Sequence, residues 1–120
     1  MNESILTSVK KMLGLDTEYT VFDPDVIMHI NSALSILHQV GASPSSGLTV
    51  SDNTTTWDEL TLDVDHINMV KTYIFLKVRL WFDPPTSSYA LTSMEKQIEQ
   101  LEWRLSLFDR KFNPNPEVEV

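Results

Sequence analysis

Cysteine is absent from the 120 residues, and glycine, with three copies, is scarce. Without cysteine the chain cannot form disulfides, thiolate zinc sites or a cysteine nucleophile. Three glycines are too few for the loops that cradle phosphates, and neither GxGxxG nor GxxxxGK[ST] occurs in the sequence. Nothing in this composition requires an oxidising compartment, so we expect synthesis and assembly in a cytoplasm.

Basic residues are missing from the whole stretch between Lys11 and Lys71, which carries nine acidic side chains. The first eleven residues sum to +1 and residues 71–120 to zero, so the net charge of −8 arises in this middle stretch. Tight binding to nucleic acid requires a basic patch that displaces phosphate counterions. We therefore expect a protein that can lie near DNA without gripping it.

A long apolar run is also missing. The most apolar stretch, residues 67–82, is interrupted by Lys71, Lys77 and Arg79, and the N-terminal residues lack the apolar run of a signal peptide. No membrane segment is expected. The composition, 42% hydrophobic and 22% charged, is typical of one folded soluble domain.

Helical periodicity dominates what is present. A first helix is predicted over residues 3–13, with Ile5, Val9 and Met12 in its apolar stripe and Gly14 ending it. A second is predicted between Asp23, as its N-cap before Pro24, and Gly41.

A third helix, residues 65–82, is apolar around most of its circumference, which predicts a central position. Asp83, Pro84 and Pro85 end it. A last helix is predicted from residue 87 or 88 to Lys111. Its apolar residues step alternately by three and four and form a heptad seam; they are Leu91, Met94, Ile98, Leu101, Leu105, Phe108 and Phe112.

Residues 42–56 form a long loop, rich in Ser and Thr, between the second and third main helices. Leu48–Val50 is a candidate short strand or hairpin arm within it. Thr56 and Glu59 have the spacing of a capping box, which predicts a helix of one or two turns. The fold class is therefore all-α, a small bundle of about four helices over residues 1–112, with an extended C-terminal tail over residues 113–120.

Two segments have no place in the predicted core. Trp103 and Leu107 form a second apolar strip away from the seam of the last helix, which indicates either one more contact within the chain or a subunit interface. The tail NPNPEVEV cannot be helical, because its prolines break the pattern. It is either a frayed terminus or an extended segment that docks on a partner.

The spacing of the candidate residues excludes the catalytic and metal sites that we considered. His29 and His38 lie on opposite sides of one helix, and His66, at a helix start, is expected to be solvated. Residues 52–63 have the length of a calcium loop, but Trp57 replaces its glycine and Asp63 its glutamate. The acidic residues near helix starts are explained by the helix dipole. We therefore expect no cofactor, no metal and no enzymatic activity.

Three segments resemble the head–tail connector, or adaptor, proteins of tailed bacteriophages, which occur in phages and prophages. The segments are 23–37 (DPDVIMHINSALSIL), 55–60 (TTWDEL) and 69–106, with its FDPP break and EWRL helix. The resemblance implies a small helical subunit of a ring, typically of twelve copies, beneath the portal protein in the virion neck. Such a ring extends the DNA channel and carries a downstream stopper or tail protein.

The resemblance also implies roles for particular segments. Relatives dock on the portal through their C-terminal region, so the candidate docking residues here are Phe112, Asn113, Pro114, Pro116, Val118 and Val120. Leu48, Val50 and Asp52 are the candidates for contacts with the tail side or the channel. DNA would pass through without specific binding, and the free protein is expected to be a monomer.

Two other interpretations stay open. A small-terminase-like packaging protein is also small, helical and ring-forming, but it requires a basic recognition helix. Residues 12–70 contain no lysine or arginine, which argues against such a helix there. A generic helical interaction module fits the composition equally well and differs only in lacking the resemblance.

Overall fold

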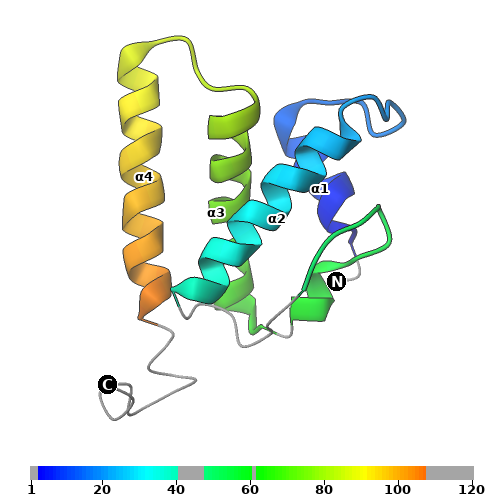
Figure 1. Cartoon of the computed structure of the whole chain (residues 1–120). Helices are drawn as coiled ribbons and strands as arrows, with labels where there is room; N and C mark the ends of the chain where they lie inside the picture. The colour runs from blue at the N-terminus through cyan, green and yellow to red at the C-terminus, as the bar shows by residue number, and fades with distance from the viewer. Residues whose placement is uncertain (1–2, 41–47, 61, 108–120) are drawn as a thin grey trace.

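The computed structural model describes residues 3–40, 48–60 and 62–107 and confirms the all-α fold (Figure 1). Its helices are α1 (Ile5–Leu13), α2 (Asp23–Gln39), α3 (Val64–Phe82) and α4 (Ser88–Ser106), with a short 3₁₀ helix, η1 (Trp57–Leu60), before α3. No strand occurs in these ranges. The predicted strand at Leu48–Val50 is therefore wrong, and the isolated bridge between Ser4 and Thr56 is the β-type pairing found there.

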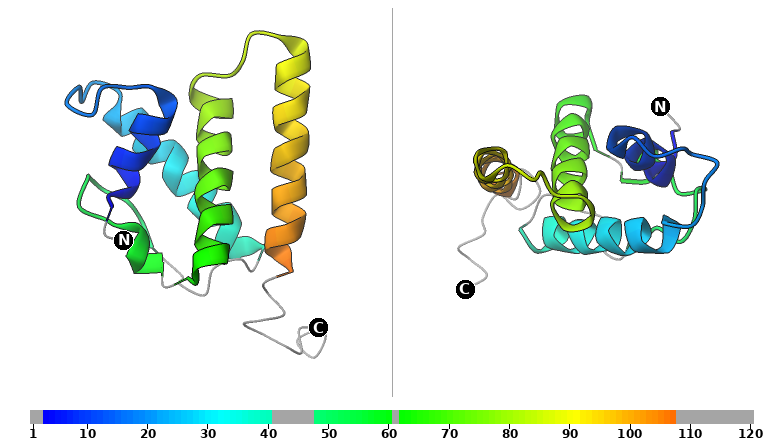
Figure 2. Two further views of the ribbon diagram at one scale, coloured as in Figure 1. Left: turned by 180° about the vertical axis from the view of Figure 1, so that it is seen from behind. Right: turned by 90° about the horizontal axis from the view of Figure 1, so that it is seen from above.

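Helix α3 is the central element, as its apolar circumference predicts. It packs against α1, α2 and α4. The view from above in Figure 2 places it between α4 on one flank and α1 on the other, with α2 running along a third side. Its buried residues point in several directions and include Val70, Tyr73, Ile74, Leu76 and Val78. Helix α4 runs antiparallel beside α3 (Figure 1).

The predicted helix ends are largely confirmed by their caps. Gly14 has φ 81°, the left-handed conformation that glycine adopts without strain, and closes α1. Asp63 Oδ1 accepts a hydrogen bond from the His66 N–H at 2.8 Å at the start of α3. Asp83 ends α3 before the two prolines, and Ser87 caps α4.

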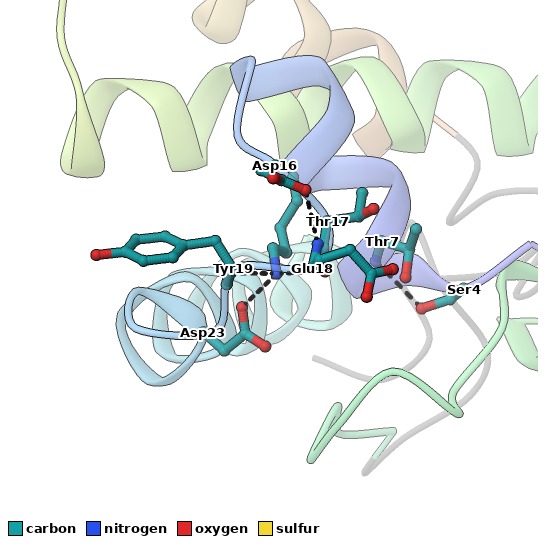
Figure 3. Close-up of polar contacts among 8 residues, drawn as sticks. Ser4, Thr7, Asp16, Thr17, Glu18, Tyr19 and Asp23 are labelled. Atoms are coloured by element: carbon teal, nitrogen blue, oxygen red, sulfur yellow. Dashed lines mark hydrogen bonds and ion pairs between the residues drawn. The ribbon is translucent and has the colours of Figure 1, made fainter.

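The start of α2 differs from the prediction. Asp23 is the first helical residue rather than the N-cap, and Phe22 takes the cap position without a side-chain hydrogen bond. The reason is a long-range partner: Lys10 Nζ lies 2.7 Å from Asp23 Oδ1 and also donates to the carbonyl oxygens of Thr17, at 3.1 Å, and Tyr19, at 2.8 Å. Figure 3 shows Asp23, Thr17 and Tyr19 around this point.

Three further expectations are corrected. Met12 is exposed rather than part of the apolar stripe. In the last turn of α1 it is Leu13, one turn after Val9, that packs against the core, so the neighbouring Met12 points away from it. His66 is buried rather than solvated, because it shares the inward face of α3 with Val70, one turn on. Helix α4 ends at Ser106, five residues before the predicted end. Its last turn tightens there, with the Leu107 N–H donating to the Arg104 carbonyl at 3.2 Å. The predicted stop at Gly41 lies outside the described residues.

The segment before α3 is fixed by the rest of the fold. Asn31 Oδ1 accepts from the Val50 N–H at 2.7 Å and Asn31 Nδ2 donates to the Val50 carbonyl at 2.9 Å, so a side chain replaces a strand partner. The Trp57 indole N–H donates to Ser8 Oγ at 3.0 Å. One half of the predicted capping box is present, since the Thr56 N–H donates to Glu59 Oε2 at 3.0 Å, whereas the Glu59 N–H donates to the Thr56 carbonyl at 3.1 Å rather than to its side chain.

Candidate functional site

The outer face of α4 carries large apolar side chains that the bundle does not cover. Ile98 and Leu105, in the predicted seam, are buried against α3, whereas Trp103 is 66% exposed and Leu107 47%. The expectation that these two residues lie off the seam is confirmed. Exposed tryptophan is enriched at interface hot spots, so the subunit interface remains the prediction for this surface.

A second surface, which we call the aromatic end, lies where α3 ends and α2 begins. It consists of Tyr19, Phe22, Trp81 and Phe82. The Phe22 ring packs edge-on against Tyr19, with centroids 5.8 Å apart, and against Phe82, at 5.4 Å. Trp81 continues the surface and has Lys77 Nζ 4.8 Å from its ring centroid.

Sequence reasoning missed the aromatic end, because Tyr19 and Phe22 belong to a turn without helical periodicity and Phe82 to a distant helix end. A signal was nevertheless present. Tyr19, Val21 and Phe22 are three apolar residues outside any periodic stripe, and all three are exposed. Apolar side chains in a polar turn that is not buried indicate a contact surface.

A third surface is a hollow of about 470 Å³ between η1 and the first two turns of α3. Its described lining residues are Trp57, Asp58, Leu62, Val64, Ile67, Asn68 and Lys71. The apolar walls are open to solvent, since Val64 is 73% exposed. Lys71 Nζ lies 5.4 Å from the centroid of the Trp57 ring. We call this feature the η1–α3 hollow.

The predicted loop residues have three different environments. Val50 is buried and hydrogen-bonded through its backbone to Asn31, and Leu48 is half-buried against the core. Asp52 is exposed, and hydrogen bonds from the hydroxyl and N–H of Thr54 hold the pKa of its carboxyl below the ordinary value. Asp52 is therefore the one of the three whose side chain is available to a partner.

The predicted docking residues Phe112, Asn113, Pro114, Pro116, Val118 and Val120 lie outside the described residues. What the structure locates is the point from which that segment starts. The last turn of α4 lies at the same end of the molecule as η1, whereas the end of α3 and the start of α2, which carry the aromatic end, lie at the opposite end (Figures 1 and 2).

The buried polar groups join elements to one another. The Tyr73 hydroxyl donates to Glu102 Oε2 at 2.7 Å, and Lys77 Nζ lies 3.7 Å from the same oxygen, so α3 and α4 share one polar contact. Burial and this hydrogen bond raise the pKa of the Tyr73 phenol above its ordinary value. Within the described ranges no group of three or more His, Asp or Glu side chains is placed to hold a metal ion. None of the described helices combines the length and the apolar composition that a membrane span requires.

Comparison with known proteins identifies the family. Residues 5–111 match the family described as phage connector protein, whereas comparisons with curated proteins and with solved structures found no match. The matched range runs from the first residue of α1 past the end of α4 and includes the outer face of α4, the aromatic end and the η1–α3 hollow. The chain therefore belongs to the phage connector protein family and is a component of the phage neck.

Proposed function

We propose that the protein is an adaptor subunit that forms a ring, expected as a dodecamer, beneath the phage portal. The ring extends the DNA channel and carries the next stopper or tail protein. One observation carries the proposal: the described residues form a helical core and expose apolar side chains on three separate surfaces. A ring subunit needs four contacts, one with each of two neighbours and one each with the components above and below it, which the three surfaces and the C-terminal tail together can provide.

The polar groups of the fold support a structural rather than an enzymatic role. Buried Lys10 and Tyr73 are each engaged with an acidic side chain of another element, Asp23 and Glu102. A catalytic acid or base would be expected in a cleft beside a reacting group. These pairs instead tie helices together, as a scaffold requires.

The positions of the surfaces favour one orientation in the neck. If residues 112–120 dock on the portal, the end of the molecule at which α4 finishes faces the portal, and the exposed Asp52 is then a candidate for the channel lining. The aromatic end then faces the downstream component. An acidic channel lining would let DNA slide, since like charges disfavour adhesion. This assigns the virion neck as the final location, after assembly in the host cytoplasm.

The charge distribution disfavours the packaging alternative. A small-terminase-like protein requires a basic recognition helix. Helix α2 contains no lysine or arginine, and α3 buries most of its length between its neighbours. Neither helix therefore offers a basic outward face of the kind that enters a DNA groove.

Electron microscopy of the full chain mixed with the portal protein of the same phage tests the proposal. We expect a ring of density coaxial with the portal channel, on the side that receives the tail. Deleting residues 113–120 should leave the circular dichroism spectrum and thermal midpoint unchanged while lowering portal affinity by about tenfold or more. Undiminished portal affinity of the shortened chain would exclude the docking role of this tail, and no portal association of the full chain would overturn the proposed function.

A further inference from the structure

A closed ring of identical subunits needs two different surfaces on each chain, because each copy contacts its two neighbours through opposite flanks. The two surfaces must also lie at the same height along the ring axis, since a rotation brings one onto the other. In Figures 1 and 2 the last turn of α4 and η1 meet both conditions: they lie at the same end of the molecule, on opposite sides of α3. The aromatic end lies at the other end and does not.

The last turn of α4 is a projection. Trp103 and Leu107 are exposed on the side of the helix opposite the buried seam, and Arg104 lies beside them. At 3.6 residues per turn, Glu95 and Glu99 lie roughly 140° to 180° around the helix from Arg104. Arg104 is therefore the cation on one side of Trp103, while Glu99, one turn earlier, lines the same surface hollow on the other side.

The η1–α3 hollow complements this projection in shape and charge. Leu62, Val64 and Ile67 give it apolar walls, and its volume of about 470 Å³ is enough to receive an indole ring. Asp58 and Lys71 line the hollow, and Asp65, exposed in the first turn of α3, follows the lining residue Val64. The Asp65 carboxylate is the candidate partner of Arg104, since among the described residues no ion pair involves either side chain.

We infer that neighbouring subunits associate head to tail, with the Trp103–Leu107 projection of one copy seated in the η1–α3 hollow of the next. The inference rests on the proposed ring and specifies its subunit contact. The other occupant available in this chain, the C-terminal EVEV of residues 117–120, brings two further carboxylates to a surface on which Asp58 and Asp65 outnumber Lys71, and it is disfavoured by charge. The Arg104 side of α4 brings the opposite charge.

Disulfide trapping tests this contact without background from other cysteines of the chain, because its natural sequence has none. One full-length variant carries Gln100→Cys, on the projection, and the other Asn68→Cys, in the hollow; both positions are exposed. Mixed with the portal under mild oxidation, the two variants should yield heterodimers, and the double variant a ladder of multimers. The matched control is Thr92→Cys, eight residues or roughly 12 Å earlier on α4, which should give no heterodimer with Asn68→Cys.

Charge reversal provides an independent readout. Arg104→Glu and Asp65→Lys should each lower ring occupancy on the portal by about tenfold, and the two changes combined in one chain should restore it. Ring density on the portal without a bond between positions 100 and 68 would overturn the inferred contact and leave the proposed function intact. Trapping of Asn68→Cys by Val118→Cys instead would assign the hollow to the tail. Failure to form any ring on the portal would overturn both proposals.

Discussion

Lys10 has almost no exposed surface, yet it carries a charge in the core between α1 and α2. Its side chain is 3% exposed, and its ammonium group contacts Asp23 and the carbonyl oxygens of Thr17 and Tyr19. The methylene groups of Lys10 pack in the core, while its ammonium group holds the turn that leads into α2. The same contact positions Tyr19 and Phe22, so the aromatic end depends on it.

Lys10→Met should therefore lower the free energy of unfolding by about 3 kcal/mol, because it leaves a partly buried carboxylate and two carbonyl groups without their donor. Urea denaturation measures the change. Lys11→Met is the matched control: this neighbouring side chain is 62% exposed and lies 3.6 Å from Glu3, so its loss should cost at most about 0.5 kcal/mol. Equal costs for the two variants would show that the Lys10 network adds no stability.

Tyr73 should make stability fall at high pH. Burial and the Glu102 hydrogen bond raise the pKa of its phenol in the folded state above the ordinary value near 10. Above pH 10 the unfolded chain therefore releases a proton that the folded chain retains, and the free energy of unfolding falls by at most about 1.4 kcal/mol per pH unit.

The comparison with Tyr73→Phe isolates this effect from the titration of lysines. The variant should be about 1 kcal/mol less stable at pH 7, because Glu102 loses a hydrogen bond. The difference should shrink as the pH rises through 10 and 11, when denaturation is followed at each pH. A difference that is constant with pH would show that the phenol ionises equally in the folded and unfolded states.

At the scale of the helices, the signals that predicted structure correctly act within one turn. Gly14 closes α1, Pro84 follows the end of α3, and the three–four spacing of α4 identifies Ile98 and Leu105 as its buried face. Each depends on backbone conformation or side-chain spacing within a few residues. The predicted core position of α3 follows in the same way from its nearly continuous apolar surface.

The predictions that failed depend on partners far away in the chain. Asp23 is not a cap because Lys10 binds it, and Val50 is not in a strand because the side chain of Asn31 satisfies its backbone. The aromatic end and the η1–α3 hollow form from segments that only the fold brings together. Local patterns identified Trp103 and Leu107 as outside the seam. The same patterns carry no information about which surface these two residues contact.

Helix α4 allows stability and assembly to be separated on one element. Leu105→Ala should lower the free energy of unfolding by about 3 kcal/mol, since its side chain is fully buried against α3. Trp103→Ala combined with Leu107→Ala should leave helix content and the thermal midpoint nearly unchanged and weaken ring assembly, because both side chains are largely exposed. Circular dichroism and electron microscopy of portal-bound rings give the two readouts. A loss of helix content that matches the loss of assembly would show that Trp103 and Leu107 belong to the core.

At the scale of the whole molecule, charge opposes the association that the exposed apolar surfaces favour. Each chain carries a net charge of −8. Two neighbouring subunits have their centres roughly 30 Å apart, about twice the radius of gyration of a compact domain of this length. At that distance their net charges repel by about 9 kcal/mol in water without salt. Screening reduces this repulsion to about 3 kcal/mol at 0.01 M salt, where the Debye length is about 30 Å. At 0.15 M, where it is about 8 Å, less than about 0.5 kcal/mol remains. A single exposed ion pair such as that inferred for Arg104 contributes at most about 1 kcal/mol.

The relief of repulsion is the larger of the two effects, so self-association should strengthen with salt rather than weaken. Between 0.01 M and 0.15 M NaCl, the apparent dissociation constant of the subunit contact should fall by about tenfold or more, measured by analytical ultracentrifugation over a concentration series. Arg104→Gln should associate more weakly at every salt concentration and keep the same upward trend, because it changes one contact and leaves the total charge strongly negative. Association that weakens steadily with added salt would mean that ion pairs across the interface outweigh the repulsion between whole subunits, and the contact would then have to contain several such pairs rather than one cation beside an apolar projection.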